Sequence, residues 1–96
     1  MRIDEANPDH VPDAGALRAF LDRDGRIAVY PRKDAVRQAL LRWALGQILA
    51  PEEALTEPEL NQRMTAVTDD PATLRRYLVE RDLLRREPDG SRYVRP

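Results

Sequence analysis

Residues 56–82 read TEPELNQRMTAVTDDPATLRRYLVERD and contain two helix starts. Thr56 and Glu59 have the T-x-x-E spacing of a capping box, in which each side chain bonds to a free backbone N–H at the helix start. Asp70 precedes Pro71, an order typical of an N-cap and the first helical position, where proline loses no hydrogen bond. The stretch therefore predicts two helices joined by a tight turn, which is a helix-turn-helix.

Both predicted helices carry apolar residues at helical spacing. Such a stripe buries one side of a helix in a core and leaves the other side in water. The inward residues are Leu60, Met64 and Val67 in the first helix and Leu74, Tyr77 and Leu78 in the second. The second helix is expected to run to about Asp82, and Leu84 follows it on the buried side. These stripes predict one shared core under the helix-turn-helix.

The C-terminal residues predict a β-hairpin. Residues 84–87 and 92–95 are expected to form its strands, and residues 88–91 its turn. Asp89-Gly90 between short strands favours a hairpin because glycine accepts the positive φ of a tight turn. The predicted fold is therefore α+β and mostly helical: a winged helix-turn-helix with one short strand upstream and a C-terminal hairpin as its wing.

The N-terminal third predicts an arm, a short helix and a strand. Residues 1–12 contain two prolines and no apolar periodicity. We expect them to form an extended or frayed arm before a domain that spans residues 13–96. Asp13 can cap a helix that ends near Asp22. Residues 27–30 are expected to form the short strand.

A long helix is predicted over residues 34–49. Its apolar residues cover more than half of the circumference, a wider stripe than that of an ordinary surface helix. We predict a homodimer that buries part of this face. The alternative is that the first helix and the strand cover it within one chain. The predicted core residues of the whole domain are Leu40, Trp43, Leu74, Leu78 and Leu84.

The composition limits the classes of function. A chain of 96 residues builds one domain, and the absence of cysteine removes disulfides, thiolate nucleophiles and cysteine metal sites. No apolar run approaches the roughly 20 residues of a membrane helix, and the acidic first residues are unlike a signal peptide, so we expect a cytoplasmic protein. His10 has no second metal ligand nearby, and no catalytic set or phosphate loop occurs. We therefore expect a protein that is not an enzyme and has no metal, cofactor or small-molecule ligand.

The charges are segregated along the chain, although the net charge is −1. Residues 1–25 carry a net charge of −3, residues 26–50 +4, residues 51–70 −5 and residues 71–96 +3. The overall balance argues against a nonspecific nucleic-acid coat. The two positive segments nevertheless leave room for a local basic face.

The second predicted helix contains Thr73, Arg75, Arg76 and Leu78 in the order T-x-R-R-x-L. This order resembles the recognition helix of the bacterial winged-helix repressors that control sugar and deoxyribonucleoside catabolism. The resemblance implies that the threonine and both arginines face DNA and that the leucine anchors the core.

A wider resemblance runs from about Ala28 to the C-terminus. The residues that carry it are Tyr30-Pro31-Arg32-Lys33, Arg37, Thr56 to Glu59 with Asn61, Asp69 to Arg76, and Gly90 to Tyr93. They are similar to a small bacterial family of domains of unknown function, number twenty eighty-seven in its series. Its members often occur attached to helix-turn-helix regulators. The resemblance therefore implies a winged-helix-like fold and a transcriptional context, and it supplies no catalytic residue.

Helical position supports part of this assignment. With Leu74 and Leu78 inward, Thr73 and Arg76 lie outward near the helix end that enters the major groove in this motif, and Arg75 flanks them. Arginine can read guanine through two hydrogen bonds or hold a phosphate. The predicted DNA-binding residues are Thr73, Arg75, Arg76, Arg86 and Arg92, the last two on the hairpin.

Two functions remain open. The first is a DNA-binding transcriptional regulator, or a winged-helix module associated with one. The second is a non-catalytic module for protein–protein interaction or dimerisation, with no direct DNA contact. Arginines on a face clear of Glu57, Glu59 and Asp70 favour the first function, whereas arginines interleaved with these carboxylates favour the second.

A second basic cluster precedes the long helix. It consists of Arg32, Lys33 and Arg37. These side chains can touch phosphates, or they can pair with the acidic block at residues 52–59. We favour the pairing, which makes the cluster structural.

Overall fold

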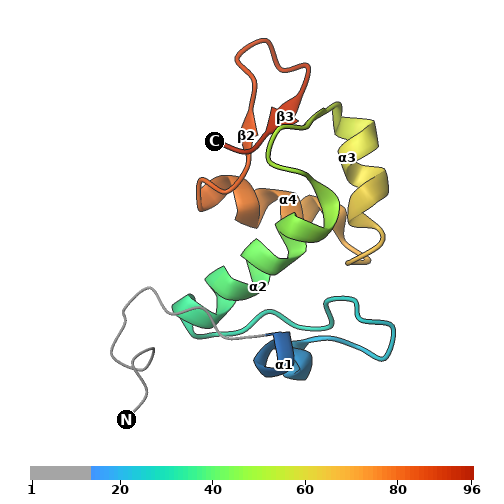
Figure 1. Cartoon of the computed structure of the whole chain (residues 1–96), viewed down its shortest axis with the longest axis vertical. Coiled ribbons are helices and arrows are strands. Elements are labelled where there is room, and N and C mark those ends of the chain that lie inside the picture. Colours follow the sequence, from blue (N-terminus) through green and yellow to red (C-terminus); the bar gives the residue numbers. More distant parts are fainter. Residues whose placement is uncertain (1–13) are drawn as a thin grey trace.

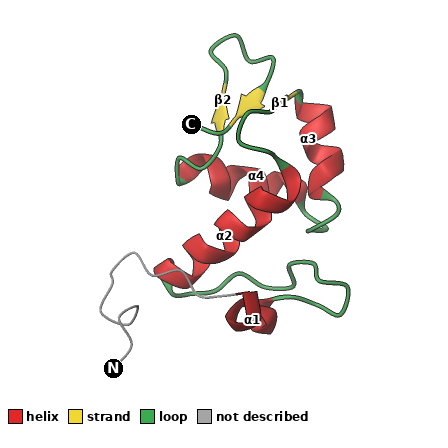
Figure 2. Cartoon of the chain, in the orientation of Figure 1, coloured by secondary structure: helices red, strands yellow, loops and turns green. Residues whose placement is uncertain are grey.

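The computed structural model describes residues 14–96, so the predicted arm, the cap at Asp13 and His10 lie outside the described residues. The fold is α+β and mostly helical, with one small antiparallel sheet (Figures 1 and 2). The elements are α1 (Ala14–Leu17), the 3-10 helix η2 (Arg18–Phe20), α2 (Asp34–Ile48), β1 (Ala54–Leu55), α3 (Glu57–Met64), α4 (Pro71–Glu80), β2 (Arg85–Arg86) and β3 (Tyr93–Val94). None of the helices in this part of the chain is long and apolar enough to cross a membrane.

The long helix α2 is confirmed and lies at the centre of the fold. In Figure 1 it runs between α1 and the unit formed by α3, α4 and the sheet. One side, with Leu40, packs against Leu17 of α1. The other side, with Leu41 and Ile48, packs against α3, α4 and the sheet. The wide apolar face of α2 is therefore covered within one chain, and a homodimer no longer follows from it.

The predicted core residues are confirmed with one exception. Leu40, Leu74, Leu78 and Leu84 are at most 1% exposed. Trp43 is only partly buried, because its large indole lies at the border between the two halves of the core and packs against both.

The predicted strand at residues 27–30 does not form. Only an isolated bridge joins Ile27 to Leu21. The N–H of Ile27 donates to the carbonyl of Val67 (2.7 Å), whereas those of Ala28 and Val29 both donate to the carbonyl of Phe20. Because successive N–H groups have different partners or share one, no ladder can extend. The segment is a loop that ties α1 and η2 to the α3–α4 turn.

The first predicted helix is split and ends early. It consists of α1 and η2 and stops at Phe20, two residues before the predicted end, because Leu21 already has extended backbone angles. Beyond it, the Oδ1 of Asp22 accepts hydrogen bonds from the N–H groups of Asp24 and Arg26. These bonds close a turn in which Gly25 has a φ of 76°.

Both helices of the predicted helix-turn-helix are confirmed, with their caps. The hydroxyl of Thr56 accepts from the Glu59 N–H, and the Glu59 carboxylate accepts from the Thr56 N–H at 2.9 Å. Asp70 accepts from the N–H of Thr73, and Pro71 occupies the first turn of α4. The inward stripe of α3 continues to Val67 in the turn, and all its predicted members are buried.

The end of α4 comes earlier than predicted. The helix stops at Glu80 rather than at Asp82. Asp82 has a φ of 58°, which is a left-handed conformation that cannot continue a right-handed helix. The N–H groups of Leu83 and Leu84 instead donate to the carbonyl of Leu78 and close the helix end.

The hairpin is confirmed with shorter strands than predicted, and it gains a third strand. The sheet has the order β1-β3-β2 and is antiparallel throughout. Tyr93 of the central strand β3 lies opposite Leu55 of β1 on one side and opposite Arg86 of β2 on the other. The strand β1 is absent from the prediction, because it has only two residues, which are too few to show the alternation of apolar and polar residues typical of a strand. It becomes a strand only through pairing with β3, in which Ala54 lies opposite Val94 and Leu55 opposite Tyr93.

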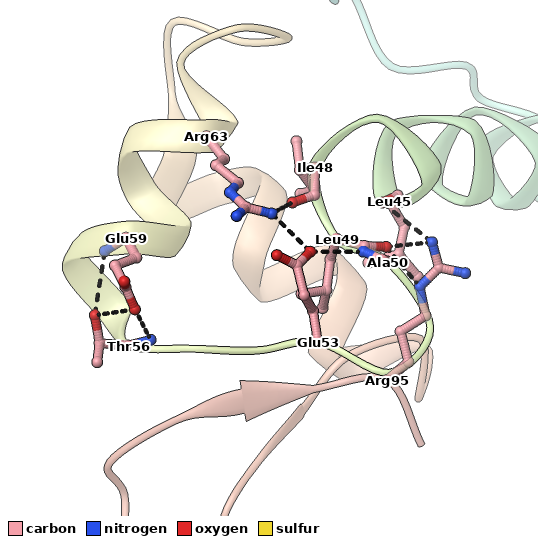
Figure 3. A network of polar contacts seen from close by, with 9 residues as sticks. All are labelled: Leu45, Ile48, Leu49, Ala50, Glu53, Thr56, Glu59, Arg63 and Arg95. Atoms are coloured by element: carbon pink, nitrogen blue, oxygen red, sulfur yellow. Dashed lines mark hydrogen bonds and ion pairs between the residues drawn. The ribbon is translucent and has the colours of Figure 1, made fainter.

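Arginine side chains close the C-terminal end of α2. Arg63 of α3 donates to the Ile48 carbonyl at 3.1 Å, and Arg95 after β3 donates to the Leu49 carbonyl. Figure 3 shows both guanidinium groups at this end, with Glu53 bonded to Arg63 and to the N–H of Ala50. The last carbonyls of a helix have no partner within the helix, and these guanidinium groups supply hydrogen-bond donors for them. Their positive charge also interacts favourably with the negative end of the helix dipole.

Candidate nucleic-acid interface

Thr73 belongs to the cap of α4. Its side chain is half-buried, and its hydroxyl donates to the Oδ2 of Asp70 at 2.7 Å. This bond, together with the one from the Thr73 N–H, lowers the pKa of Asp70. The predicted DNA-contacting hydroxyl is therefore already engaged at the helix start.

Arg75 points toward α3 and the sheet. Its guanidinium donates to the Oδ1 of Asn61, and its Nε lies 3.9 Å from the Oε1 of Glu57. The same Oε1 accepts a hydrogen bond from the hydroxyl of Tyr93 at 2.9 Å. Burial raises the pKa of Tyr93, and the bond to the Glu57 carboxylate raises it further. Glu57, Asn61, Arg75 and Tyr93 thus form a junction cluster that joins α3, α4 and β3.

Arg76 follows Arg75 but reaches a different part of the molecule. Its side chain is exposed, and its guanidinium carbon lies 5.8 Å from the centre of the Tyr77 ring. The guanidinium carbon of Arg37 lies 5.4 Å from the centre of the same ring. Tyr30 meets that ring edge-on at 4.8 Å. Neighbouring residues on a helix are about 100° apart, so the two predicted helix arginines do not share a face.

The hairpin presents two exposed arginines from the predicted set. Arg86 donates to the carbonyl of Gly90 at 3.4 Å. Arg92 is close enough to Glu59 and Asp89 to help lower the pKa of each, although local hydrogen bonds from Thr56 and Ser91 are the larger causes. Within residues 14–96, neither hairpin arginine lies within ion-pair distance of a carboxylate.

The charge arrangement around the predicted site is mixed. Glu57 lies beside Arg75, Glu59 lies in the field of Arg92, and Asp70 lies in the field of Arg76. The arginines therefore do not form a face clear of the acidic residues. Arginines interleaved with carboxylates favour a protein-binding surface. Arg76 and the two hairpin arginines nevertheless have no close ion pair within residues 14–96, so they are available to an anion.

The second basic cluster does not pair with the acidic block at residues 52–59. Glu53 of that block binds Arg63 at 2.7 Å, and Glu57 lies beside Arg75. Arg37 instead donates to the carbonyl of Pro31 and lies over the Tyr77 ring. The pairing predicted for this cluster is wrong because the block lies beyond the C-terminal end of α2, while the cluster lies at its start.

The sequence prediction missed two members of the junction cluster, Asn61 and Tyr93. In the sequence both residues belong only to the family pattern, and Tyr93 also lies in the second strand of the predicted hairpin. Inward alternation in a strand could have suggested that Tyr93 is buried. No local spacing indicates its contact with Glu57. Among residues 14–96, no group of three or more His, Cys, Asp or Glu side chains could hold a metal ion.

The comparisons with known proteins give one match. Residues 26–95 match the model of a family described as "Uncharacterized protein conserved in bacteria (DUF2087)". The match begins in the turn before α2 and includes the junction cluster, α4 and the hairpin. No curated protein and no solved structure matches the chain.

Proposed function

This chain belongs to DUF2087, a family of uncharacterized proteins conserved in bacteria, and on that premise we propose that it is a winged-helix module that binds double-stranded DNA within, or beside, a transcriptional regulator. The order α3, turn, α4, hairpin supports the winged helix, and β1 adds a third strand beside the hairpin. In this motif the second helix enters the major groove and the first crosses the backbone.

The observation that carries the proposal is the availability of the arginines on α4 and the hairpin. Arg76, Arg86 and Arg92 are exposed, and none of them lies within 4.0 Å of a carboxylate in the described part of the chain. Arginine binds phosphate well because its fork of N–H donors matches the phosphate oxygens. These side chains can therefore exchange water for phosphate without breaking an ion pair.

The proposal gives the predicted residues different roles. Arg76, on the exposed side of α4, contacts base edges, while Arg86 and Arg92 hold the phosphates beside the groove. Thr73 and Arg75 position α4: the first through the Asp70 cap and the second through Asn61 and Glu57. A direct contact of Arg75 with DNA would require it to leave these partners.

A titration against duplex DNA tests this function. Fluorescence anisotropy with a labelled random-sequence duplex, at two salt concentrations, should show binding that weakens as salt rises, because bound arginines release counterions. With a net charge of −1, binding should be weak at physiological salt. Failure to bind any duplex at low ionic strength, for random and genomic sequences alike, would reject the proposal.

A second candidate function is a protein-interaction module that binds another protein or a second copy of this chain. The interleaving of Glu57, Glu59 and Asp70 with the arginines favours it. Sedimentation equilibrium at micromolar concentration tests self-association. A dimer mass would support this candidate, whereas a single 11.0 kDa species would reject a homodimer.

A further inference from the structure

The start of α2 carries positive charge that the rest of the described chain does not neutralise. Arg32 and Lys33 are exposed, and neither has an ion pair within residues 14–96. The nearby acid is Asp34, and it is taken by Arg81 of the α4 end at 2.6 Å. The hydrogen bond from Arg81 is the main cause that lowers the pKa of Asp34. The charges of Arg32 and Lys33 are left for an outside partner.

Tyr77 connects this charge to α4. The guanidinium groups of Arg37 from α2 and Arg76 from α4 both lie over or beside its ring. Arg37 is also held by the carbonyl of Pro31, directly before Arg32. Arg32, Lys33 and Arg37 thus form a basic cluster at the start of α2, which we name the α2-start surface. Arg76 adjoins it across the Tyr77 ring.

The chemistry of the α2-start surface fits phosphate better than protein. Protein interfaces are centred on apolar and aromatic side chains. Among residues 14–96, the exposed large hydrophobic residues are Val29 and Val79. The α2-start surface offers guanidinium and ammonium donors, which are the groups that contact the phosphates of duplex DNA.

We propose that the α2-start surface binds the phosphate backbone of the duplex on the side of α4 away from the hairpin. This inference rests on the proposed function, because Arg76, the residue proposed to contact base edges, lies beside this surface across the Tyr77 ring. The hairpin arginines would hold one backbone segment, and Arg32 and Lys33 another. Two phosphate contacts flanking α4 would fix its orientation in the groove without reading sequence.

The test compares salt dependence in variants of the full chain. The double variant Arg32→Ala/Lys33→Ala should bind a labelled random-sequence duplex more weakly than the unaltered chain. The slope of log K against log salt concentration should fall by about one to two units, since each lost phosphate contact removes about 0.9. The matched control is Arg42→Ala, an exposed arginine about 140° around α2 from Arg37, which should leave the slope unchanged.

Separate outcomes overturn the inference and the function. Suppose that the unaltered chain binds duplex and that Arg86→Ala/Arg92→Ala lowers the slope, but Arg32→Ala/Lys33→Ala does not. The α2-start surface is then not a DNA contact, and the proposed function stands. If the unaltered chain binds no duplex, both fail together. Circular dichroism melts check that the variants are folded. Both altered side chains at the α2 start are exposed and lie before the helix, so the melting temperature should not change.

Discussion

The hydroxyl of Tyr93 in β3 donates a hydrogen bond to the carboxylate of Glu57, the first residue of α3, across 2.9 Å. The two residues are 36 positions apart, and Arg75 of α4 lies beside the same carboxylate oxygen. The Tyr93 ring is 5% exposed, and its hydroxyl end reaches the half-exposed Glu57. One carboxylate therefore contacts both α4 and β3 from the start of α3.

Removing this hydroxyl should destabilise the fold. Tyr93→Phe keeps the buried ring and loses one hydrogen bond, so the free energy of unfolding should fall by about 0.5–1.5 kcal/mol. Tyr77→Phe is the matched control, because the Tyr77 hydroxyl makes no hydrogen bond within residues 14–96. Urea unfolding measures both. A double-mutant cycle with Glu57→Ala should give a coupling energy above zero, and a coupling of zero would show that the bond contributes nothing.

Truncating a side chain of α4 should strongly destabilise the fold only on the buried face of this helix. Leu78 is fully buried, so Leu78→Ala should lower the free energy of unfolding by about 2–5 kcal/mol. Its neighbour Val79 is 41% exposed, and Val79→Ala should cost much less. Equal effects of the two substitutions in denaturant melts, or a loss below about 1 kcal/mol for Leu78→Ala, would contradict the assigned inward face.

The pairing of Glu53 with Arg63 should make stability depend on acid pH. The Arg63 hydrogen bond is the main cause that lowers the pKa of Glu53 from 4.5 to about 2, and the Ala50 N–H adds to it. A folded-state pKa below the unfolded one stabilises the fold fully above the unfolded pKa, and this stabilisation is lost as pH falls through the folded pKa. The loss should therefore lie between pH 4.5 and about 2.

Glu53→Gln isolates this contribution. The variant should be less stable than the unaltered chain at pH 7, and the difference should shrink as pH falls through the same window. Thermal melts at pH 7, 4 and 2.5 measure it. A difference that stays constant with pH would mean that the ion pair does not contribute, because the glutamine cannot titrate while Glu53 can.

The proposed DNA contacts should separate into two kinds. Arg76→Ala should cost about 1–3 kcal/mol at a selected binding site and relax the sequence preference there, as expected for lost base contacts. Arg92→Ala should weaken all duplexes alike and lower the salt slope by about one unit. Binding to a selected site and to a random duplex, measured at several salt concentrations, distinguishes the two. Identical effects of both substitutions would remove the assigned difference between helix and hairpin.

Arg75→Ala should act on stability more than on binding. Arg75 is held by Asn61 and lies beside Glu57, and its side chain is only 23% exposed. Its removal leaves the Asn61 amide oxygen without this donor and Glu57 without its cation. A lower melting temperature with little change in the salt slope is expected. The reverse result would return Arg75 to the DNA-contacting set.

Local signals in the sequence determined α3 and α4 and their caps. Thr56 with Glu59, and Asp70 with Thr73, act over three residues, so their spacing already defines the bonds that form. The stripe from Leu74 to Leu78 likewise follows from helical geometry alone. The membership of Thr73, Arg75 and Arg76 in one helix could therefore be predicted.

Only the tertiary structure decided what the arginines with distant partners contact. Arg75 meets Asn61, 14 residues away, and Arg95 closes the end of α2 from 46 residues away. The strand expected at residues 27–30 does not form, because the N–H of Ile27 donates to the carbonyl of Val67. The strand β1 forms because Leu55 pairs with Tyr93 of β3. Such partners are brought together by the packing of elements that lie far apart in the sequence. The spacing of residues in the sequence predicts contacts between near neighbours along the chain. It does not predict which distant carboxylate or carbonyl a guanidinium group contacts.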